Sequence, residues 1–216
     1  MKKAVVTGAS GNLGKAVVLE LLGKGYEVAG TGLFSAPLNG YTGAKVDLSD
    51  DNATHDWVTA QTGTGTVDTA ILTVGGFAMG NISATPVSDI HEQIRLNFDT
   101  AYRVAAPLFS HMKGKGTGTL FLVGSQAGMS SEKNVGVTAY GLAKSLLFRL
   151  ADLMNIEAKG TDVKVFVVVP FIIDTPANRA SMPDADRSAW QTPEQIASRI
   201  YAYIEHPADH DTLMVF

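Results

Sequence analysis

Residues 3–14 read KAVVTGASGNLG, and this stretch decides the fold. Its apolar start predicts a buried strand, and the periodic apolar residues between Leu13 and Lys24 predict a helix. Three glycines spaced three apart separate the two elements. Such a turn lets the backbone approach a pyrophosphate and leaves the N–H groups of the helix N-terminus free for phosphate oxygens. We therefore predict that Gly8, Gly11 and Gly14 form a dinucleotide-binding turn.

The alternation of strand and helix continues along the whole chain. Further strands are predicted at 26–31, 44–46, 67–74, 119–123, 163–169 and 213–216, and further helices at 51–61, 87–112, 137–159 and 192–205. Strands that are apolar on both faces and alternate with helices indicate a parallel sheet covered on both sides. We predict one α/β domain over residues 1–216, a Rossmann-type doubly wound sheet of about seven strands in the order 3-2-1-4-5-6-7. The irregular stretch 171–190 follows a strand end, which predicts a substrate lid.

Composition excludes several classes of protein. The chain has 216 residues, 22 glycines, no cysteine, 18% charged residues and a net charge of −4. Intrinsic disorder, a disulfide framework, a thiolate zinc site and a cysteine nucleophile are excluded, and the charge argues against a nucleic-acid partner. The five histidines show no metal-ligand spacing, so no metal site is predicted. No apolar run suits a signal peptide or a membrane span, so we expect a cytoplasmic location and no membrane partner.

Four polar residues form the candidate reaction set. Tyr140 and Lys144, in the stretch YGLAK, are four residues apart and therefore share one helix face. A phenol has a pKa near 10, and a neighbouring ammonium group can lower it towards neutral pH. Ser125 follows the predicted strand 119–123, and Asn97 is a polar residue within an apolar helical stretch. The alternatives are structural: a turn-capping hydroxyl for Ser125 and an amide bonded to backbone for Asn97.

The second predicted strand ends without the acidic residue that usually binds an adenosine ribose. Residues 29–35 read AGTGLFS and contain neither an acid nor an arginine. Because an acid at this place would repel a 2′-phosphate, its absence favours NADP(H), while NAD(H) remains an alternative. Lys15 and the hydroxyl groups of Thr31 and Ser35 are candidates for holding that phosphate.

Most of the chain, from Lys3 to about Ile204, resembles the short-chain dehydrogenase/reductase family. The resemblance is carried by TGASGNLG at 7–14, Asp47-Leu48, Gly75-Gly76, Asn97, Ser125, YGLAK at 140–144, and Pro170 with Thr175. Within the family, VGGFAMG at 74–80 and DTPANRASMPDADRSAW at 174–190 are similar to the dihydropteridine reductases.

The resemblance implies roles for these residues. Tyr140 would exchange a proton with the substrate oxygen, Lys144 would lower the tyrosine pKa and bind the nicotinamide ribose, and Ser125 would steady the substrate oxygen. Asn97 would help place a proton-relay water. The implied cofactor-binding residues are Gly8, Ser10, Gly11, Asn12, Leu13, Gly14, Asp47, Leu48, Gly75, Tyr140, Lys144, Pro170 and Thr175.

The expected function is therefore NAD(P)H-dependent reduction of a small cyclic carbonyl or a quinonoid dihydropteridine-like substrate. The alternative is a non-catalytic NAD(P)-sensing regulatory protein of the same fold. The predicted helices 87–112 and 137–158 resemble the family's dimer-forming pair, so a homodimer or homotetramer is expected.

Overall fold

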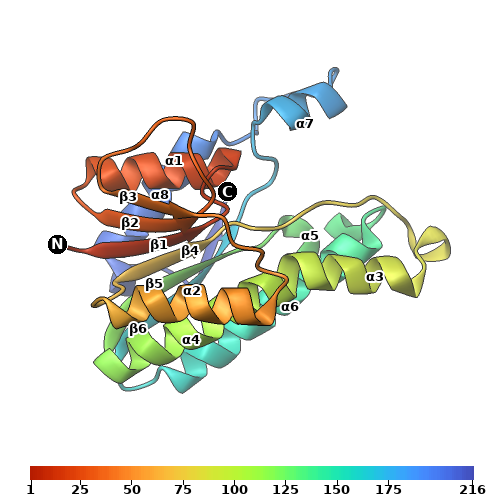
Figure 1. Cartoon of the computed structure of the whole chain (residues 1–216). Helices are drawn as coiled ribbons and strands as arrows, with labels where there is room; N and C mark the ends of the chain where they lie inside the picture. The colour runs from red at the N-terminus through yellow and green to blue at the C-terminus, as the bar shows by residue number, and fades with distance from the viewer.

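Seven parallel strands form one sheet in the order β3-β2-β1-β4-β5-β6-β7 (Figure 1). The computed structural model describes all 216 residues. The strands are β1 (Lys3–Thr7), β2 (Glu27–Thr31), β3 (Tyr41–Ala44), β4 (Thr69–Leu72), β5 (Thr117–Val123), β6 (Asp162–Val169) and β7 (Leu213–Val215). β1 pairs on one side with β2 and on the other with β4, so Ala4 lies between Val28 and Thr69. The predicted strand order is confirmed, and the order reverses between β1 and β4, where a parallel sheet opens a crevice for ligands.

Helices cover both faces of this sheet, as predicted (Figure 1). One face carries α1 (Asn12–Gly23) and α8 (Pro193–Glu205), and the other carries α2 (Asp51–Gly63), α4 (Thr100–Lys115) and α6 (Thr138–Glu157). The shorter helices are α3 (Val87–Ile94), α5 (Gln126–Met129) and α7 (Pro176–Ser181), with 3-10 turns at Ile82–Ala84, Glu132–Asn134 and Pro207–Asp209. No helix combines the length and the apolar character that crossing a membrane would need.

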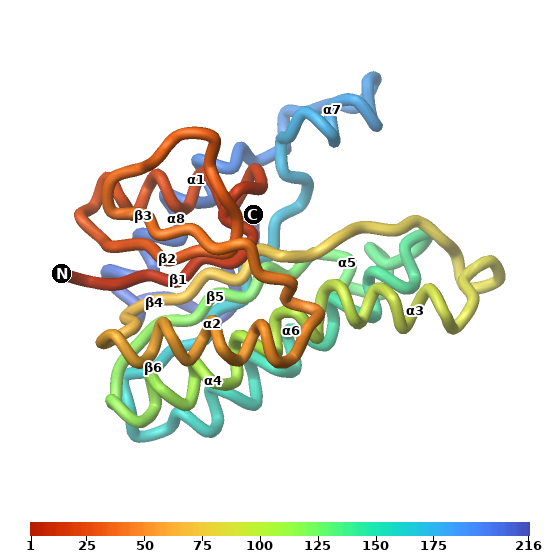
Figure 2. Tube along the Cα trace, viewed as in Figure 1, coloured from red at the N-terminus to blue at the C-terminus, as the bar shows by residue number.

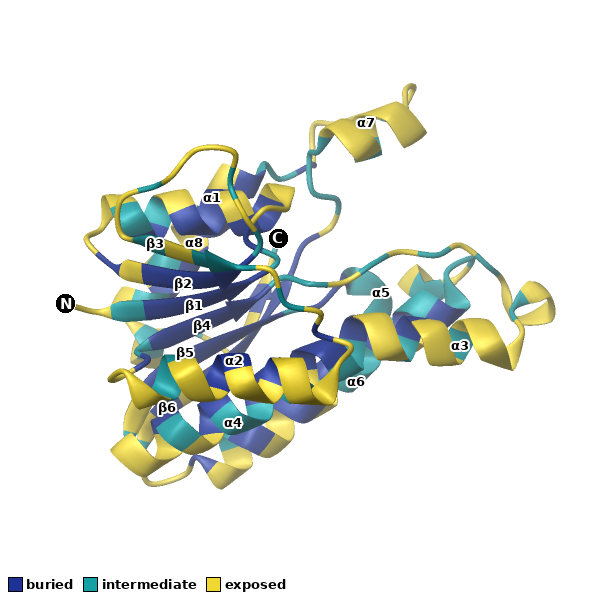
Figure 3. Cartoon of the chain, viewed as in Figure 1, coloured by how far each residue is buried: buried dark blue, intermediate teal, exposed yellow.

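Each face of the sheet has its own hydrophobic core (Figure 3). Val5 and Leu72 pack with α2, α4 and α6, whereas Val6, Ile71 and Phe166 pack with α1 and α8. Because neighbouring residues of a strand point to opposite faces, a strand buried on both sides must be apolar at nearly every position. This explains the unbroken apolar runs in the sequence.

Two predicted helix starts are confirmed by their caps. The Asp50 carboxylate accepts a hydrogen bond from the Ala53 N–H at 2.9 Å and begins α2. Thr192 and Gln195 form a reciprocal capping box at the start of α8, with Pro193 in its first turn. Both caps satisfy N–H groups that have no partner within the helix.

Three predicted elements differ from the structure. The third strand is Tyr41–Ala44 rather than 44–46, because the Tyr41 hydroxyl donates to the Gly32 carbonyl at 2.6 Å and its ring packs on Phe34. The predicted helix 87–112 is divided into α3 and α4 by a π-helical turn at Arg95–Asp99. The predicted irregular lid contains α7, which Thr175 caps.

Two segments project beyond the carboxyl ends of the strands (Figure 2). The first runs from the end of β4 to α3, and the second contains α7. The first is tied to the beginning of α6 by a parallel bridge between Gly80 and Val137, and the second is closed at its base by a bridge between Ile173 and Gln191. These bridges fix the bases of the two projecting segments.

Candidate active site

The glycine turn after β1 is built from backbone. Gly8 has a φ of 64°, in the left-handed region that favours glycine. Its N–H donates to the Thr31 hydroxyl oxygen at 2.9 Å, and its carbonyl accepts from the Gly11 N–H at 2.9 Å. A side-chain carbon at Gly14 would overlap the Gly8 carbonyl. The turn therefore requires glycine both for its conformation and for the close approach of α1.

The N-terminus of α1 is open to a ligand. Gly11 is the residue that caps this 12-residue helix, and it offers no side-chain hydrogen bond. The first N–H groups of α1, which include those of Asn12 and Leu13, therefore remain available to an anion, and the helix dipole favours negative charge there. This arrangement fits the pyrophosphate of a dinucleotide, with Ser10 beside it on the turn.

The end of β2 differs in part from what the sequence suggested. Thr31 is buried, and its hydroxyl oxygen accepts the Gly8 N–H, so Thr31 supports the turn rather than facing a 2′-phosphate. Lys15 and Ser35 are exposed and stay candidates for that contact.

Asp47 and Leu48, the predicted adenine contacts, follow β3. The exposed Asp47 carboxylate accepts hydrogen bonds from the Ser49 hydroxyl at 2.7 Å and the Ser49 N–H at 2.9 Å, which lower its pKa below the ordinary value. Leu48 is buried in the core, so its side chain contributes packing at this corner.

Ser125 and Tyr140 meet where α5 packs on α6. Ser125 caps α5, its hydroxyl oxygen accepting from the Ala127 N–H at 3.2 Å, which is the turn-capping role considered from the sequence. α5 lies against the main chain of α6 at Lys144, where Gly128 permits the approach. The structure therefore brings Ser125, Tyr140 and Lys144 together at the carboxyl end of β5.

The electrostatics of this cluster differ from the sequence expectation. Burial raises the pKa of Tyr140, and its hydrogen bond with Ser125 opposes that rise. Burial lowers the pKa of Lys144 to about 8. The Lys144 ammonium donates to the Val123 carbonyl at 2.8 Å and lies 5.8 Å from the centre of the Tyr140 ring. The expected lowering of the tyrosine pKa by Lys144 is therefore not present, because desolvation dominates both groups.

Asn97 is fully buried in the π-helical turn that follows α3. Its Oδ1 accepts from the Gly76 N–H at 3.1 Å, and its Nδ2 donates to the main-chain carbonyl and the side-chain oxygen of Gln93 at 3.1 and 3.0 Å. A Cβ added to Gly75 would lie 2.6 Å from Asn97 Oδ1 and 3.2 Å from Lys144 Nζ. Asn97 therefore lies close to Lys144, while its side chain is hydrogen-bonded to the main chain of Gly76 and of Gln93.

Gln93 was not identified from the sequence. The only signal that could have indicated it is its position four residues before Asn97, a spacing at which helical side chains are neighbours. That spacing is common on helices. The burial of Gln93 depends on the packing of α3 against α6, which the sequence does not show.

The remaining predicted cofactor residues, Pro170 and Thr175, lie at the start of the predicted lid. Pro170 is buried directly after β6, and the Thr175 hydroxyl oxygen accepts from the Asn178 N–H at 3.2 Å. The exposed ring of Phe77 meets the Tyr140 ring edge-on, with centres 5.1 Å apart. Tyr140 therefore lies beneath an apolar ring at the open side of the cluster.

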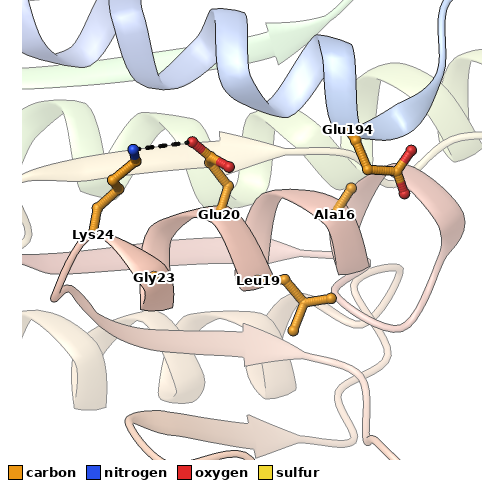
Figure 4. A pocket seen from close by; sticks show the side chains of 6 residues that line it. All are labelled: Ala16, Leu19, Glu20, Gly23, Lys24 and Glu194. Carbon is orange, nitrogen blue, oxygen red and sulfur yellow. Dashed lines mark ion pairs between the residues drawn. The ribbon is translucent and has the colours of Figure 1, made fainter.

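A separate hollow of about 320 Å³ lies between α1 and α8 (Figure 4). Lys24 and Glu20 form an ion pair of 3.8 Å along its wall. The complete lining is Ala16, Leu19, Glu20, Gly23, Lys24 and Glu194, and none of these belongs to the reaction cluster. No group of three or more histidine or acidic side chains is placed to hold a metal ion.

A doubly wound parallel sheet, a glycine turn at the N-terminus of its first helix and a serine, tyrosine and lysine cluster define a class, the nicotinamide-dependent oxidoreductases. The chain belongs to the short chain dehydrogenase family, whose sequence profile matches residues 2–186. It is accordingly an NAD(P)-dependent oxidoreductase.

Relatives with different names share this family. The chain is 28% identical over 203 residues to the 3-oxoacyl-acyl-carrier-protein reductase FabG of Pseudomonas aeruginosa, covering 87% of this chain and 80% of that protein. It is 25% identical over 140 residues to the dihydropteridine reductase of Dictyostelium discoideum, covering 63% of this chain and 59% of that protein. The structure of ElxO with NADP bound matches the fold with a TM-score of 0.88 at 20% identity, covering 99% and 96% of the two chains. The family is thus established, and the particular substrate is not.

Proposed function

We propose that this oxidoreductase uses NADPH to reduce a small cyclic carbonyl or a quinonoid dihydropteridine-like substrate, with Asn97, Ser125, Tyr140 and Lys144 as its reaction set. The observation that carries the proposal is the position of Tyr140. Its ring meets the exposed Phe77 ring edge-on at 5.1 Å and lies 5.8 Å from the Lys144 ammonium, near the carboxyl ends of the strands. The alternative of a non-catalytic sensor does not explain why the buried Lys144 lies beside the partly exposed Tyr140.

The cofactor would be held by the turn and the crevice. Gly8, Ser10, Gly11, Asn12, Leu13 and Gly14 would bind the pyrophosphate side, Asp47 and Leu48 the adenine side, and Gly75, Pro170 and Thr175 the nicotinamide side. When bound, the nicotinamide supplies the hydride.

The chain's own residues would manage the proton. The Tyr140 hydroxyl donates it to the oxygen or nitrogen that becomes negative as the substrate is reduced. The Ser125 hydroxyl donates a hydrogen bond to the same atom and holds it in place. Lys144, held by its hydrogen bond to the Val123 carbonyl, would bind the nicotinamide ribose beside this group.

The surroundings of Tyr140 favour a small apolar ring as substrate. Several large apolar side chains stay exposed on the segments around the open side of the cluster, namely Phe77, Met79, Ile82, Met129, Val135 and Phe171. Exposed apolar groups that gather around polar ones are typical of a binding site. Phe77 could pack against one face of a flat substrate while Tyr140 reaches its polar atom.

One experiment tests the assigned chemistry. Turnover of quinonoid dihydropteridine and of cyclohexanone is followed by NADPH oxidation for the parent enzyme and for Tyr140→Phe. We expect the variant to lose about 10³-fold in kcat, because it lacks the proton donor, and to bind NADPH as before. Tyr201→Phe on α8, remote from the cluster, is the control and should retain full activity. Turnover that survives in Tyr140→Phe would show that its assigned role is wrong.

The preference for NADPH rests on the end of β2 and can be measured separately. Residues 32–35, which follow β2, contain no acidic side chain, and the exposed Lys15 lies in the first turn of α1. A fluorescence titration should give a Kd for NADPH at least about tenfold below that for NADH. Lys15→Ala should weaken NADPH binding only. A tighter Kd for NADH would contradict the preference.

We also infer a homodimer or homotetramer assembled through α4 and α6. Tyr102 on α4 and Leu142, Leu153 and Ile156 on α6 are large apolar residues left exposed on these helices. Burying such groups against a second copy would remove them from water. Light scattering that gives the mass of a single chain would contradict the inference.

A further inference from the structure

Gln93 is a buried polar residue near the end of α3, outside the reaction set. Only 7% of its surface is exposed, and Asn97, four residues later, is fully buried. Asn97 Nδ2 donates to Gln93 Oε1 at 3.0 Å and to the Gln93 main-chain carbonyl at 3.1 Å. The two oxygens of Gln93 therefore receive both hydrogens of the Asn97 amide.

The orientation of the Asn97 amide follows from these contacts. The Gly76 N–H can only donate, so the group that faces it at 3.1 Å must be the Asn97 oxygen. The amide nitrogen then has to face Gln93. Without the Gln93 side-chain oxygen, one buried N–H would lose its partner, and the amide would no longer be held in a single orientation.

The position of Asn97 matters because the end of β4 and Lys144 are both close to it. The site where Gly75 would carry a Cβ is 2.6 Å from Asn97 Oδ1 and 3.2 Å from Lys144 Nζ. The helix itself is irregular here, since Arg95–Asp99 form a π-helical turn. The main-chain hydrogen bonds of this turn differ from those of an α-helix, and the side-chain contact to Gln93 adds to them at Asn97.

We propose that Gln93 is a positioning residue, which orients the Asn97 amide and through it holds the Gly75–Gly76 segment beside Lys144. Its effect on turnover rests on the proposed reductase activity, whereas its effect on the Gly75–Gly76 segment does not. Two kinds of measurement therefore separate a failure of this inference from a failure of the proposed function.

The first measurement needs no substrate. Gln93→Met keeps the length of the side chain and removes the acceptor. We expect hydrogen exchange of the Gly76 amide to become about tenfold faster in Gln93→Met and in Asn97→Ala, the scale of one hydrogen bond. The double variant should be no faster than Asn97→Ala alone, because Gln93 acts through Asn97. Glu92→Met, an exposed neighbour on the same helix, is the control and should exchange like the parent.

The second measurement is kinetic, with NADPH and quinonoid dihydropteridine. We expect kcat of Gln93→Met to fall about tenfold while the KM for the pteridine stays within about twofold, a split that a purely structural loss would not give. Gln93→Glu retains an acceptor oxygen and should restore most of kcat.

Several results would overturn the inference: an unchanged Gly76 exchange rate, an unchanged kcat, or losses that add fully to those of Asn97→Ala. If Gln93→Met does not fold, Gln93→Ala takes its place in both measurements. A parent enzyme that does not reduce the pteridine would contradict the substrate proposal alone, since the exchange measurements still decide the role of Gln93.

Discussion

The glycine turn and the reaction cluster lie at the same edge of one sheet, yet they are held in opposite ways. The turn is held mainly by backbone contacts, such as the Ala9 N–H to the Thr31 carbonyl and the Gly11 N–H to the Gly8 carbonyl. The cluster consists of side chains, among them a lysine whose burial lowers its pKa to about 8. The turn therefore requires residues without a side chain, whereas the cluster requires polar side chains that are costly to bury.

The largest expected effect comes from adding one carbon to the turn. In Gly14→Ala, the new Cβ would overlap the Gly8 carbonyl, so α1 has to move away from the turn. We expect the free energy of unfolding to fall by about 3 kcal/mol and NADPH binding to weaken at least about 100-fold. Thermal melting and NADPH titration measure both quantities.

Gly23→Ala in the same helix is the matched control for Gly14→Ala. An added Cβ at Gly23 meets no atom within 4 Å, so the substitution should stabilise α1 by about 0.5 kcal/mol through helix propensity. Equal effects at Gly14 and Gly23 would contradict the view that the turn is limited by space.

The second prediction removes a functional group from the cluster. The pKa of Lys144 is about 8 when folded against 10.5 when unfolded, so protonation of this group opposes folding. The cost is fully present below about pH 8 and disappears as the pH rises from about 8 to 10.5. It corresponds to about 3 kcal/mol. The lost hydrogen bond to Val123 offsets about 1 kcal/mol.

Lys144→Met should therefore be about 2 kcal/mol more stable than the parent at pH 7, although inactive, and this gain should shrink towards pH 10.5. Chemical denaturation across this range measures it. The exposed Lys159→Met is the control and should show no comparable change. A Lys144→Met variant that is less stable at every pH would mean that the cluster carries no burial cost.

The smallest expected effect concerns His111, an ionisable residue that belongs neither to the glycine turn nor to the reaction cluster. His111 Nε2 accepts the Val67 N–H at 3.4 Å, and burial, with Lys115 and Lys3 nearby, lowers its pKa. The folded chain then holds this proton less tightly than the unfolded chain, so stability falls as the pH drops below about 6.5. His111→Gln should flatten that slope slightly between pH 7 and 5, because solvent screens this partly exposed group, and chemical denaturation at the two pH values measures it. An unchanged slope would assign the acid sensitivity to other groups.

Much of the fold was predictable because its signals are local. The apolar strands and the start of the last helix at Thr192 are visible in the sequence, which also offers Ser49 and Asp50 as caps before residue 51, and the strand order follows from the Rossmann pattern. The break in the helix at Asn97 was not predictable, because it accompanies a contact with Gly76, which is distant in the chain. The third strand was placed three residues late for a similar reason, since Tyr41 is held by its hydrogen bond to Gly32.

The site shows the same division. Residue types and spacing indicated Tyr140, Lys144, Ser125 and the glycine turn, and the structure brings the first three together. Sequence could not show that Lys144 is bonded to the Val123 carbonyl or that burial governs its pKa, because both depend on how α6 packs against β5. The sequence did not indicate Gln93, because residue type alone does not distinguish a buried glutamine from an exposed one.

The central position of β1 also has a consequence for the order of assembly during synthesis. β1 and β2 follow each other in the sequence, but the other edge of β1 stays unpaired until β4, which begins at Thr69, has been synthesised. Until then the exposed edge of β1 can pair wrongly with other strands. Pairings between distant segments are slow to form. We expect the ribosome-bound chain to assemble the strands beside the glycine turn first. Tyr140 and Lys144 should reach their final positions only after β5 and β6 have joined the sheet.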